Sequence, residues 1–133
     1  MTTGIMNERN SIHTVLVIEG KPSLKNELTS ALTEADFEVA DASDYFEALW
    51  RLDEFNPDLV LMNVDLPLLN GWEACYWLHK TFGIPIIMMG NEPSDKAWVR
   101  ATQTGADFYL KAPFSHSELT ARIKAVLRRY KKD

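Results

Sequence analysis

The stretch DLVLMNVDLP at residues 58–67 carries the clearest signal of the fold. It opens with a short run of large apolar residues, which is typical of a strand buried on both faces of a parallel sheet. The run ends in Asn63, which Asp65 and Pro67 follow closely. The stretch therefore predicts a strand over residues 58–63 that ends in a polar loop. It also raises the question of whether Asn63 reacts, replaces a reacting group or does neither.

Four further short runs of strand character lie at residues 14–18, 37–41, 85–89 and 107–110. Between them apolar residues recur at helical spacing, as Leu24, Leu28 and Leu32 do after Pro22. Strict alternation of strand and helix predicts a parallel sheet with helices on both faces and right-handed crossovers. The fold class that we expect is therefore α/β, a (βα)5 three-layer sandwich of flavodoxin type with a five-stranded parallel sheet.

Each later helical stretch is preceded by a residue of the kind that caps helix N-termini, namely Ser43 or Asp44, Asn70, Ser94 and Ser115. Ser115 is followed three residues later by Glu118, which is the spacing of a capping box. Gly105 is well placed to end the fourth helix.

The length of 133 residues suffices for one compact domain and is too short for two ordinary ones. We expect the polar residues 1–12 to form a flexible N-terminal tail and residues 13–133 to form the domain. The net charge of −5 argues against direct binding of nucleic acid or of an anionic membrane. No apolar run approaches the roughly 20 residues that a transmembrane helix needs. The single cysteine, Cys75, excludes an internal disulfide and suggests a reducing, cytoplasmic location.

The carboxyl ends of the strands are where ligands bind in an open α/β sheet, near the point at which the strand order reverses. Four segments fall at that edge of the predicted fold, namely Glu19–Gly20, Asn63–Asp65, Gly90–Asn91 and Lys111–Pro113. Any chemistry is expected there.

The same segments resemble the receiver domains of two-component response regulators. The resemblance covers about residues 14–130 and rests on VLVIEGKPSL (15–24), DLVLMNVDLPLLNGWE (58–73), PIIMM (85–89) and GADFYLKAPFSHSELTARIKAVLRR (105–129). The last stretch is especially similar to receivers whose outputs are winged-helix DNA-binding domains.

This resemblance implies a site for phosphotransfer. A receiver of the family has an acidic pair after its first strand, a phosphoaccepting aspartate after its third, a serine or threonine after its fourth, and a lysine before the proline after its fifth. The aspartate takes a phosphoryl group from a histidine kinase, and the carboxylates hold Mg²⁺. The hydroxyl and the lysine bind the phosphoryl oxygens.

The sequence departs from that pattern at nearly every position. Asn63 stands at the phosphoacceptor position, four residues before Pro67, and an amide cannot replace a carboxylate nucleophile. Glu19 keeps one acid of the pair, while Gly20 removes the other. We therefore expect no cofactor and no metal, tight Mg²⁺ binding included.

Gly90 stands at the hydroxyl position and Ala112 at the lysine position. The nearest lysine, Lys111, is one residue early, and a shift of one residue turns a strand side chain to the opposite face. Tyr109 matches the switch aromatic of the family and Pro113 matches its proline, so the resemblance implies a cis Ala112–Pro113 bond. The expected site is a degenerate phosphorylation site with no catalytic residue.

Asp65 is an alternative phosphoacceptor, although a solvated loop aspartate is the favoured interpretation. His13, His79 and His116 are scattered without metal-ligand spacing, which favours ordinary surface histidines. Cys75 lies on a helical apolar stripe and is expected to be buried.

The aromatic residues leave two interpretations open. Trp72 is expected in the core. A candidate partner surface consists of Tyr76, Trp77, Trp98, Phe108 and Arg122. Either each aromatic packs locally, or one cluster forms an apolar patch that binds a protein partner. A homodimer through the region of the last helix, as the DNA-binding subgroup forms, also stays open.

The function that we expect is an atypical receiver, not an enzyme, that acts in signal transduction by protein–protein interaction without phosphorylation. The alternatives are the regulatory N-terminal half of a DNA-binding transcription regulator and a phosphoacceptor that uses Asp65.

Overall fold

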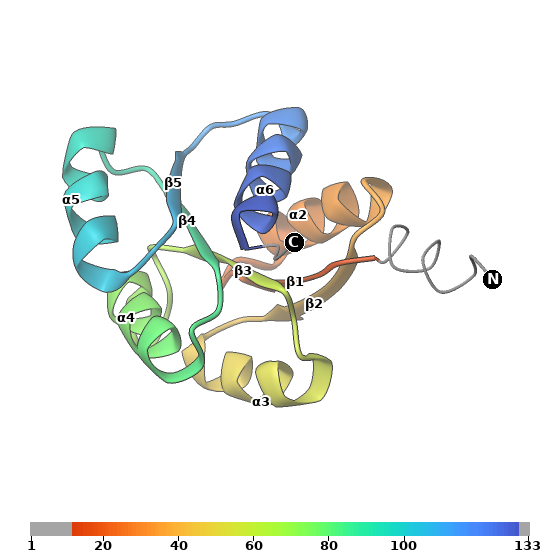
Figure 1. The fold of residues 1–133 in the computed structure, drawn as a ribbon, viewed down its shortest axis with the longest axis horizontal. Coiled ribbons are helices and arrows are strands. Elements are labelled where there is room, and N and C mark those ends of the chain that lie inside the picture. The colour runs from red at the N-terminus through yellow and green to blue at the C-terminus, as the bar shows by residue number, and fades with distance from the viewer. Residues whose placement is uncertain (1–11, 131–133) are drawn as a thin grey trace.

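The computed structural model of the protein describes residues 12–130. Within this part, five strands alternate with five helices (Figure 1). In chain order they are β1 (Thr14–Ile18), α2 (Pro22–Glu34), β2 (Glu38–Ala42), α3 (Tyr45–Phe55), β3 (Leu59–Asn63), α4 (Gly71–Phe82), β4 (Ile86–Gly90), α5 (Ser94–Thr104), β5 (Phe108–Lys111) and α6 (His116–Tyr130). The α/β alternation expected from the sequence is confirmed. Of the expected tail at residues 1–12, positions 1–11 lie outside the described residues, as do positions 131–133 of the expected domain.

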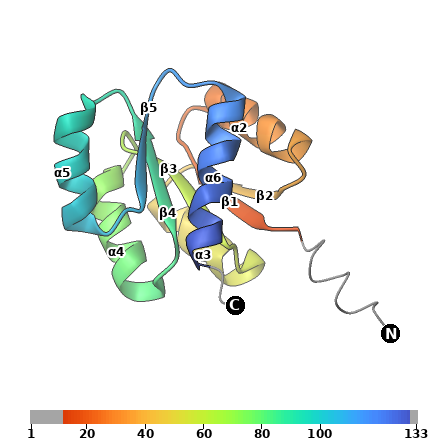
Figure 2. The same ribbon diagram turned by 45° about the horizontal axis from the view of Figure 1, so that its top comes forward.

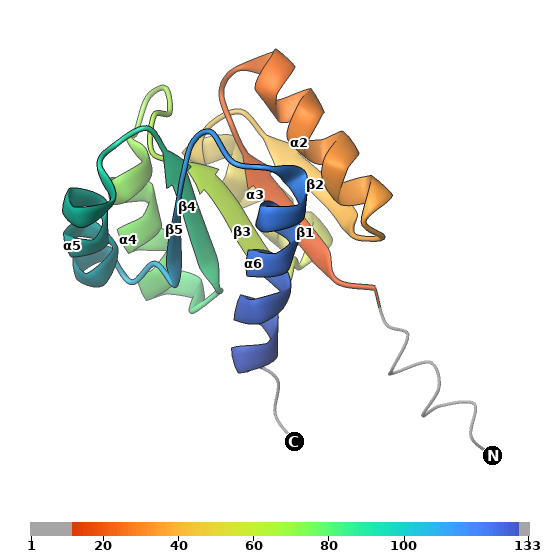
Figure 3. The same ribbon diagram turned by 90° about the horizontal axis from the view of Figure 1, so that it is seen from above.

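All strands pair in parallel in one sheet with the order β2-β1-β3-β4-β5, as Figure 2 and Figure 3 show from two further directions. The order reverses at β1, which lies between β2 and β3. The edge beyond the carboxyl ends of β1 and β3 is therefore the topological switch point, where ligands gather in such sheets.

The helices form a layer on each face of the sheet, so the structure is the expected three-layer sandwich (Figure 1). On one face, α2 and α6 bury a cluster that includes Leu28, Leu119 and Ile123. On the other face, α3, α4 and α5 bury a second cluster that includes Ala48, Leu78 and Ala97. Both clusters use the apolar side chains of β1, β3 and β4, which alternate between the faces.

The element boundaries differ from the expected ones by small amounts. The strands β2, β3, β4 and β5 each begin one residue later than the apolar pattern indicates. The capping predictions are confirmed for Asp44 and Asn70, whose side chains accept hydrogen bonds from the backbone N–H groups of Glu47 and Glu73. The prediction for Ser94 is wrong. Pro93 is the N-cap of α5, and Ser94 is its first helical residue.

None of the helices in residues 12–130 is both long and apolar enough to cross a bilayer.

Candidate functional site

The sheet brings the expected site residues to one edge. Ile18 of β1 pairs with Met62 of β3. Glu19 and Asn63 are the next residues along the chain from this pair, so they lie beside each other at the ends of the two strands. Asn63 itself pairs with Met89, one residue before Gly90. Gly90 in turn pairs with Lys111 of β5. The four segments that the sequence places at strand ends therefore lie side by side along the carboxyl edge.

Asn63 and Glu19 form a direct hydrogen-bonded pair at this edge. The Asn63 side-chain N–H donates to Glu19 Oε1 at 2.6 Å. The backbone N–H of Lys21 donates to the second oxygen, Glu19 Oε2, at 2.9 Å. Glu19 is only 1% exposed, and both of its oxygens are occupied by donors of the chain itself. A carboxylate at position 63 would meet Glu19 as a like charge, whereas the amide meets it as a donor.

The space at Gly20 is limited by a proline ring from the loop after β3. A Cβ atom placed on Gly20 would lie 2.8 Å from Pro67 Cδ, closer than real Cβ contacts come. A larger residue at position 20 would thus need the Pro67 ring to move. The position at which the family carries its second acid is covered by Pro67 here.

Gly90 lies under two side chains. A Cβ on Gly90 would lie 3.2 Å from Val64 Cγ2 and 3.3 Å from the Tyr109 hydroxyl oxygen. These distances are tighter than most Cβ contacts, so Val64 and Tyr109 take the room next to Gly90. The place that a serine or threonine side chain would fill is closely bordered by the chain's own groups.

Tyr109 is turned inward and is held by two neighbours. It is 3% exposed, and its hydroxyl donates to the backbone carbonyl of Glu92 at 3.0 Å. Its ring stacks on Trp72 with centroids 6.1 Å apart, and the Trp72 indole N–H donates to Glu92 Oε1 at 3.3 Å. Burial raises the pKa of Tyr109 above its usual value. Glu92 therefore connects the loop after β4 to both aromatic rings.

Lys111 and Asp65 lie at the rim of this edge. Lys111 is exposed, and its ammonium group contacts the carbonyl of the adjacent Ala112 at 3.5 Å. The Ala112–Pro113 peptide bond is cis, which confirms the expectation from the resemblance. Asp65 is exposed, and its backbone N–H donates to Asn63 Oδ1 at 2.9 Å. Both oxygen and nitrogen of the Asn63 amide are thus engaged.

The acidic and metal-ligating side chains do not gather at this edge. Within residues 12–130, no three His, Cys, Asp or Glu side chains lie close enough together to hold a metal ion. Glu19, the one buried carboxylate in the described part of the chain, has its two oxygens bound to N–H donors. This donor set does not fit Mg²⁺, which prefers several free oxygen ligands in octahedral geometry.

The residues of the candidate partner surface fall into two groups. On α4, the rings of Tyr76 and Trp77 contact each other edge to face with centroids 5.1 Å apart, and both are partly exposed. Between α5, β5 and α6, Trp98 contacts Phe108 edge to face at 5.1 Å, and the Arg122 guanidinium lies 4.4 Å from the Phe108 ring centroid. The two groups lie on different elements, and the side chains within each group contact one another.

The remaining sequence predictions concern single side chains. Trp72 and Cys75 are buried as expected, and burial raises the pKa of the Cys75 thiol to about 11. The histidines His13, His79 and His116 are exposed, as expected for surface residues.

Three features of the structure were missed by sequence reasoning. Glu92 belongs to no sequence motif. Its role is visible only in the hydrogen bonds that it accepts from Trp72 and Tyr109. The sequence places Pro67 four residues after Asn63, but it does not indicate that the Pro67 ring lies over Gly20. Trp50, the most exposed tryptophan at 79%, lies outside the buried stripe that a helical pattern predicts.

Comparisons with known proteins identify similar sequences and structures. A family model described as the response regulator receiver domain matches residues 15–124. The DNA-binding response regulator MtrA of Mycolicibacterium smegmatis is 38% identical over 115 residues, which are 86% of this chain and 50% of MtrA. The chain spans about half the length of the curated relatives it matches.

Solved structures of similar fold are also found. A two-component response regulator from Clostridium difficile has a TM-score of 0.83 and 27% identity, with 90% of this chain and 99% of that chain covered. The receiver domain of the Francisella response regulator 1452 has a TM-score of 0.83 and 26% identity, with 90% and 99% covered.

Proposed function

The chain belongs to the response regulator receiver domain family, and from that membership we propose that it signals through protein–protein contacts without phosphorylation of an aspartate. As a receiver domain of a response regulator, it acts in signal transduction. The proposal concerns the mode of action: a non-enzymatic, cytoplasmic module whose state is set by a protein partner.

The observation that carries the proposal is the Asn63–Glu19 hydrogen bond of 2.6 Å. In a working site the residue at position 63 would be a free nucleophile beside a metal-binding acid. Here the amide and the carboxylate satisfy each other, and Lys21 completes the pairing of Glu19. A buried, fully paired carboxylate needs no cation for its stability. Mg²⁺ is accordingly not part of the proposed function.

A second support is the way in which Tyr109 is held. Its inward position is held by contacts with Glu92 and Trp72 of the chain itself. A partner that changes the state of this fold must therefore bind the arrangement with Tyr109 inward and another arrangement with unequal affinity. The candidate partner surfaces are the Tyr76–Trp77 pair and the cluster of Trp98, Phe108 and Arg122.

Treatment with a small phosphodonor and Mg²⁺, followed by intact-mass measurement, tests the proposal. We expect no stoichiometric gain of a phosphoryl group. A full gain that disappears in Asp65→Ala would instead support phosphoacceptance by Asp65. A full gain that persists in Asp65→Ala would place the phosphoryl group on another residue and would equally overturn the proposal.

A second candidate function is favoured by the relatives themselves. MtrA is named as a DNA-binding regulator, and this chain matches only half of its length. We infer as an alternative that the chain is the regulatory half of a DNA-binding transcription regulator, with a homodimer through the region of α6. The reading frame of the natural gene beyond Asp133 distinguishes this alternative: a continuous winged-helix domain supports it, and a stop codon removes it.

A further inference from the structure

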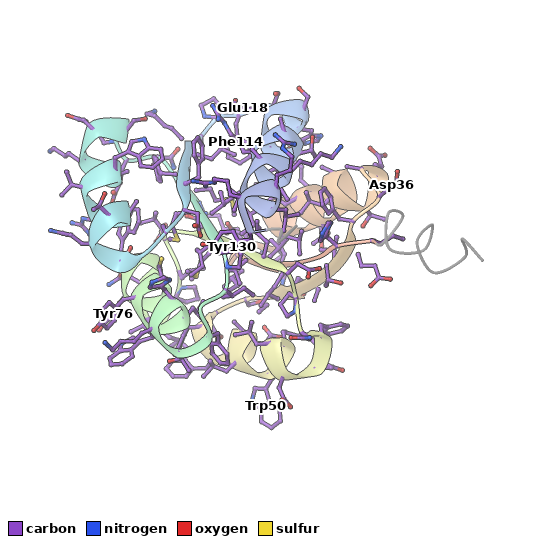
Figure 4. All side chains as sticks on the ribbon, in the orientation of Figure 1. Asp36, Trp50, Tyr76, Phe114, Glu118 and Tyr130 are labelled. Atoms are coloured by element: carbon purple, nitrogen blue, oxygen red, sulfur yellow. The ribbon has the colours of Figure 1, made fainter. Side chains whose placement is uncertain are left out.

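The helix α3 presents aromatic side chains to solvent on the side that faces away from the sheet. Its inner side buries only Ala48 and Leu52 among residues of the core. Phe46 and Trp50 are 52% and 79% exposed, and they lie four residues apart, which places them on one face of the helix. Figure 4 shows the Trp50 side chain projecting outward from α3.

The helix itself is well defined at both ends. Asp44 caps its first turn, and Asn56 in the left-handed conformation ends it with a hydrogen bond to the carbonyl of Leu52. The side chain of Glu47 also accepts from the backbone N–H of Ser43 at 2.7 Å. The two exposed rings are therefore carried on a rigid element, which limits the entropy that a bound partner would have to remove.

Carboxylates surround the exposed Trp50. Glu47 lies three residues before it, and Asp53 and Glu54 lie three and four residues after it, so all three flank its ring on the helix surface. The one arginine of the helix, Arg51, is 34% exposed at its side chain and is paired with two of these three carboxylates. It contacts Glu54 at 3.1 Å and Glu47 at 3.7 Å, and its Nε–H donates to the carbonyl of Asp41 at 2.9 Å.

We propose that the outer face of α3, formed by Phe46, Trp50, Glu47, Asp53 and Glu54, docks a basic amphipathic helix of a partner protein. The partner would receive the Trp50 ring in an apolar stripe. The three carboxylates outnumber Arg51, which bridges Glu47 and Glu54, so the face keeps a net negative charge that lysines or arginines of the partner would complement. Charge argues against a second copy of this chain on the same face. Two such faces would bring the carboxylates of both copies together, with each Arg51 already engaged. The inference rests on the proposed function only in that both require a protein partner.

The test uses a synthetic helical peptide of about five turns with a leucine stripe flanked by lysines. A matched peptide carries glutamate in place of every lysine. Binding to the full chain is followed by fluorescence anisotropy of the labelled peptides at low and at raised salt. We expect the lysine peptide to bind, the glutamate peptide not to bind, and raised salt to weaken the binding.

Variants of the protein then locate the site. Trp50→Ala should weaken binding of the lysine peptide by about tenfold or more. The double variant Asp53→Lys with Glu54→Lys should exchange the preference, so that the glutamate peptide binds better. Val99→Ala, which trims an exposed apolar side chain on α5, is the control and should leave binding unchanged. Circular dichroism of each variant verifies that the fold is kept.

Several results overturn the inference. These are absence of binding by the lysine peptide, equal binding of both peptides, or unchanged binding by Trp50→Ala. Sedimentation that shows a dimer of the protein lost in Trp50→Ala would assign the face to a second copy instead. None of these outcomes bears on phosphorylation, which the intact-mass measurement decides separately.

Discussion

The two faces of the sheet are similar inside and different outside. Each buries an apolar cluster with fully buried leucines, such as Leu119 under α6 and Leu78 under α4. On the outside, the helices α3, α4 and α5 carry nearly all of the exposed large aromatic residues, whereas α2 exposes none in the described chain and α6 exposes only Tyr130. The difference shows that burial is similar on both sides, and it is the basis of our proposal that one side contacts another molecule.

The largest expected effect tests whether the two interiors are equivalent. Leu119→Ala and Leu78→Ala each remove a fully buried side chain and leave a cavity, so each should lower the free energy of unfolding by about 2–5 kcal/mol. Urea unfolding at equilibrium measures both values. A loss below about 1 kcal/mol for one of them would show that one face is loosely packed, and the comparison between the faces would no longer hold.

The second largest effect on stability is expected at the carboxyl edge of the sheet. Asn63→Asp removes the donor to Glu19 Oε1 and puts a like charge beside a buried carboxylate. We expect the free energy of unfolding at neutral pH to fall by about 1–3 kcal/mol. The exposed Asp65→Asn is the control and should change little. An Asn63→Asp variant as stable as the original chain would mean that the hydrogen bond does not stabilise the site.

The helix α4 has a buried and an exposed side. Cys75 lies on the buried side, while the next two residues are partly exposed. Burial holds the pKa of its thiol at about 11, above the value of 9.0 for a free thiol. A raised folded-state pKa gives a stability contribution that is complete below pH 9 and is lost as the pH rises toward 11. Cys75→Ala should remove this part of the pH dependence, which urea unfolding at pH 8, 9 and 10 measures. An unchanged pH dependence would contradict the burial of the thiol.

The smallest expected effect on stability lies on the outer surface. Trp77→Ala on α4 should lower the free energy of unfolding by about 1 kcal/mol, because it removes the edge-to-face contact with Tyr76. The loss should be smaller than for Leu78→Ala, since Trp77 is 45% exposed. The same variant should reduce capture of a partner from the native cell if the Tyr76–Trp77 pair is part of an interface. A loss of stability comparable with that of Leu78→Ala would assign Trp77 to the core.

Much of the fold was predictable because burial imposes periodic patterns on the sequence. The runs at 14–18 and 58–63 gave their strands within one residue, and the positions of Glu19 and Asn63 at adjacent strand ends followed from the topology. The resemblance implied the cis bond before Pro113, which no periodicity indicates.

The details of the loops could not be predicted in this way. The approach of Pro67 to Gly20 and the two contacts of Glu92 depend on loop conformations that have no repeating pattern. The N-cap of α5 differs from the prediction because Ser94 is a good capping residue in isolation, whereas Pro93 before it has φ −56° and ψ 138°, and the proline ring favours that φ value. The exposed aromatic face of α3 around Trp50 could not be predicted, because an amphipathic pattern indicates only which side of a helix is buried.

We propose that the carboxyl edge of the sheet does not bind a divalent cation together with a phosphoryl group. A titration of the isotopically labelled protein with Mg²⁺ and beryllofluoride, an analogue of the phosphoryl group, tests it most directly by NMR. We expect the backbone amide signals of Lys21, Asn63 and Gly90 to stay in place, whereas Mg²⁺ should shift them in Asn63→Asp, which has a second carboxylate beside Glu19. Saturable shifts of the same signals in the unaltered chain would contradict it.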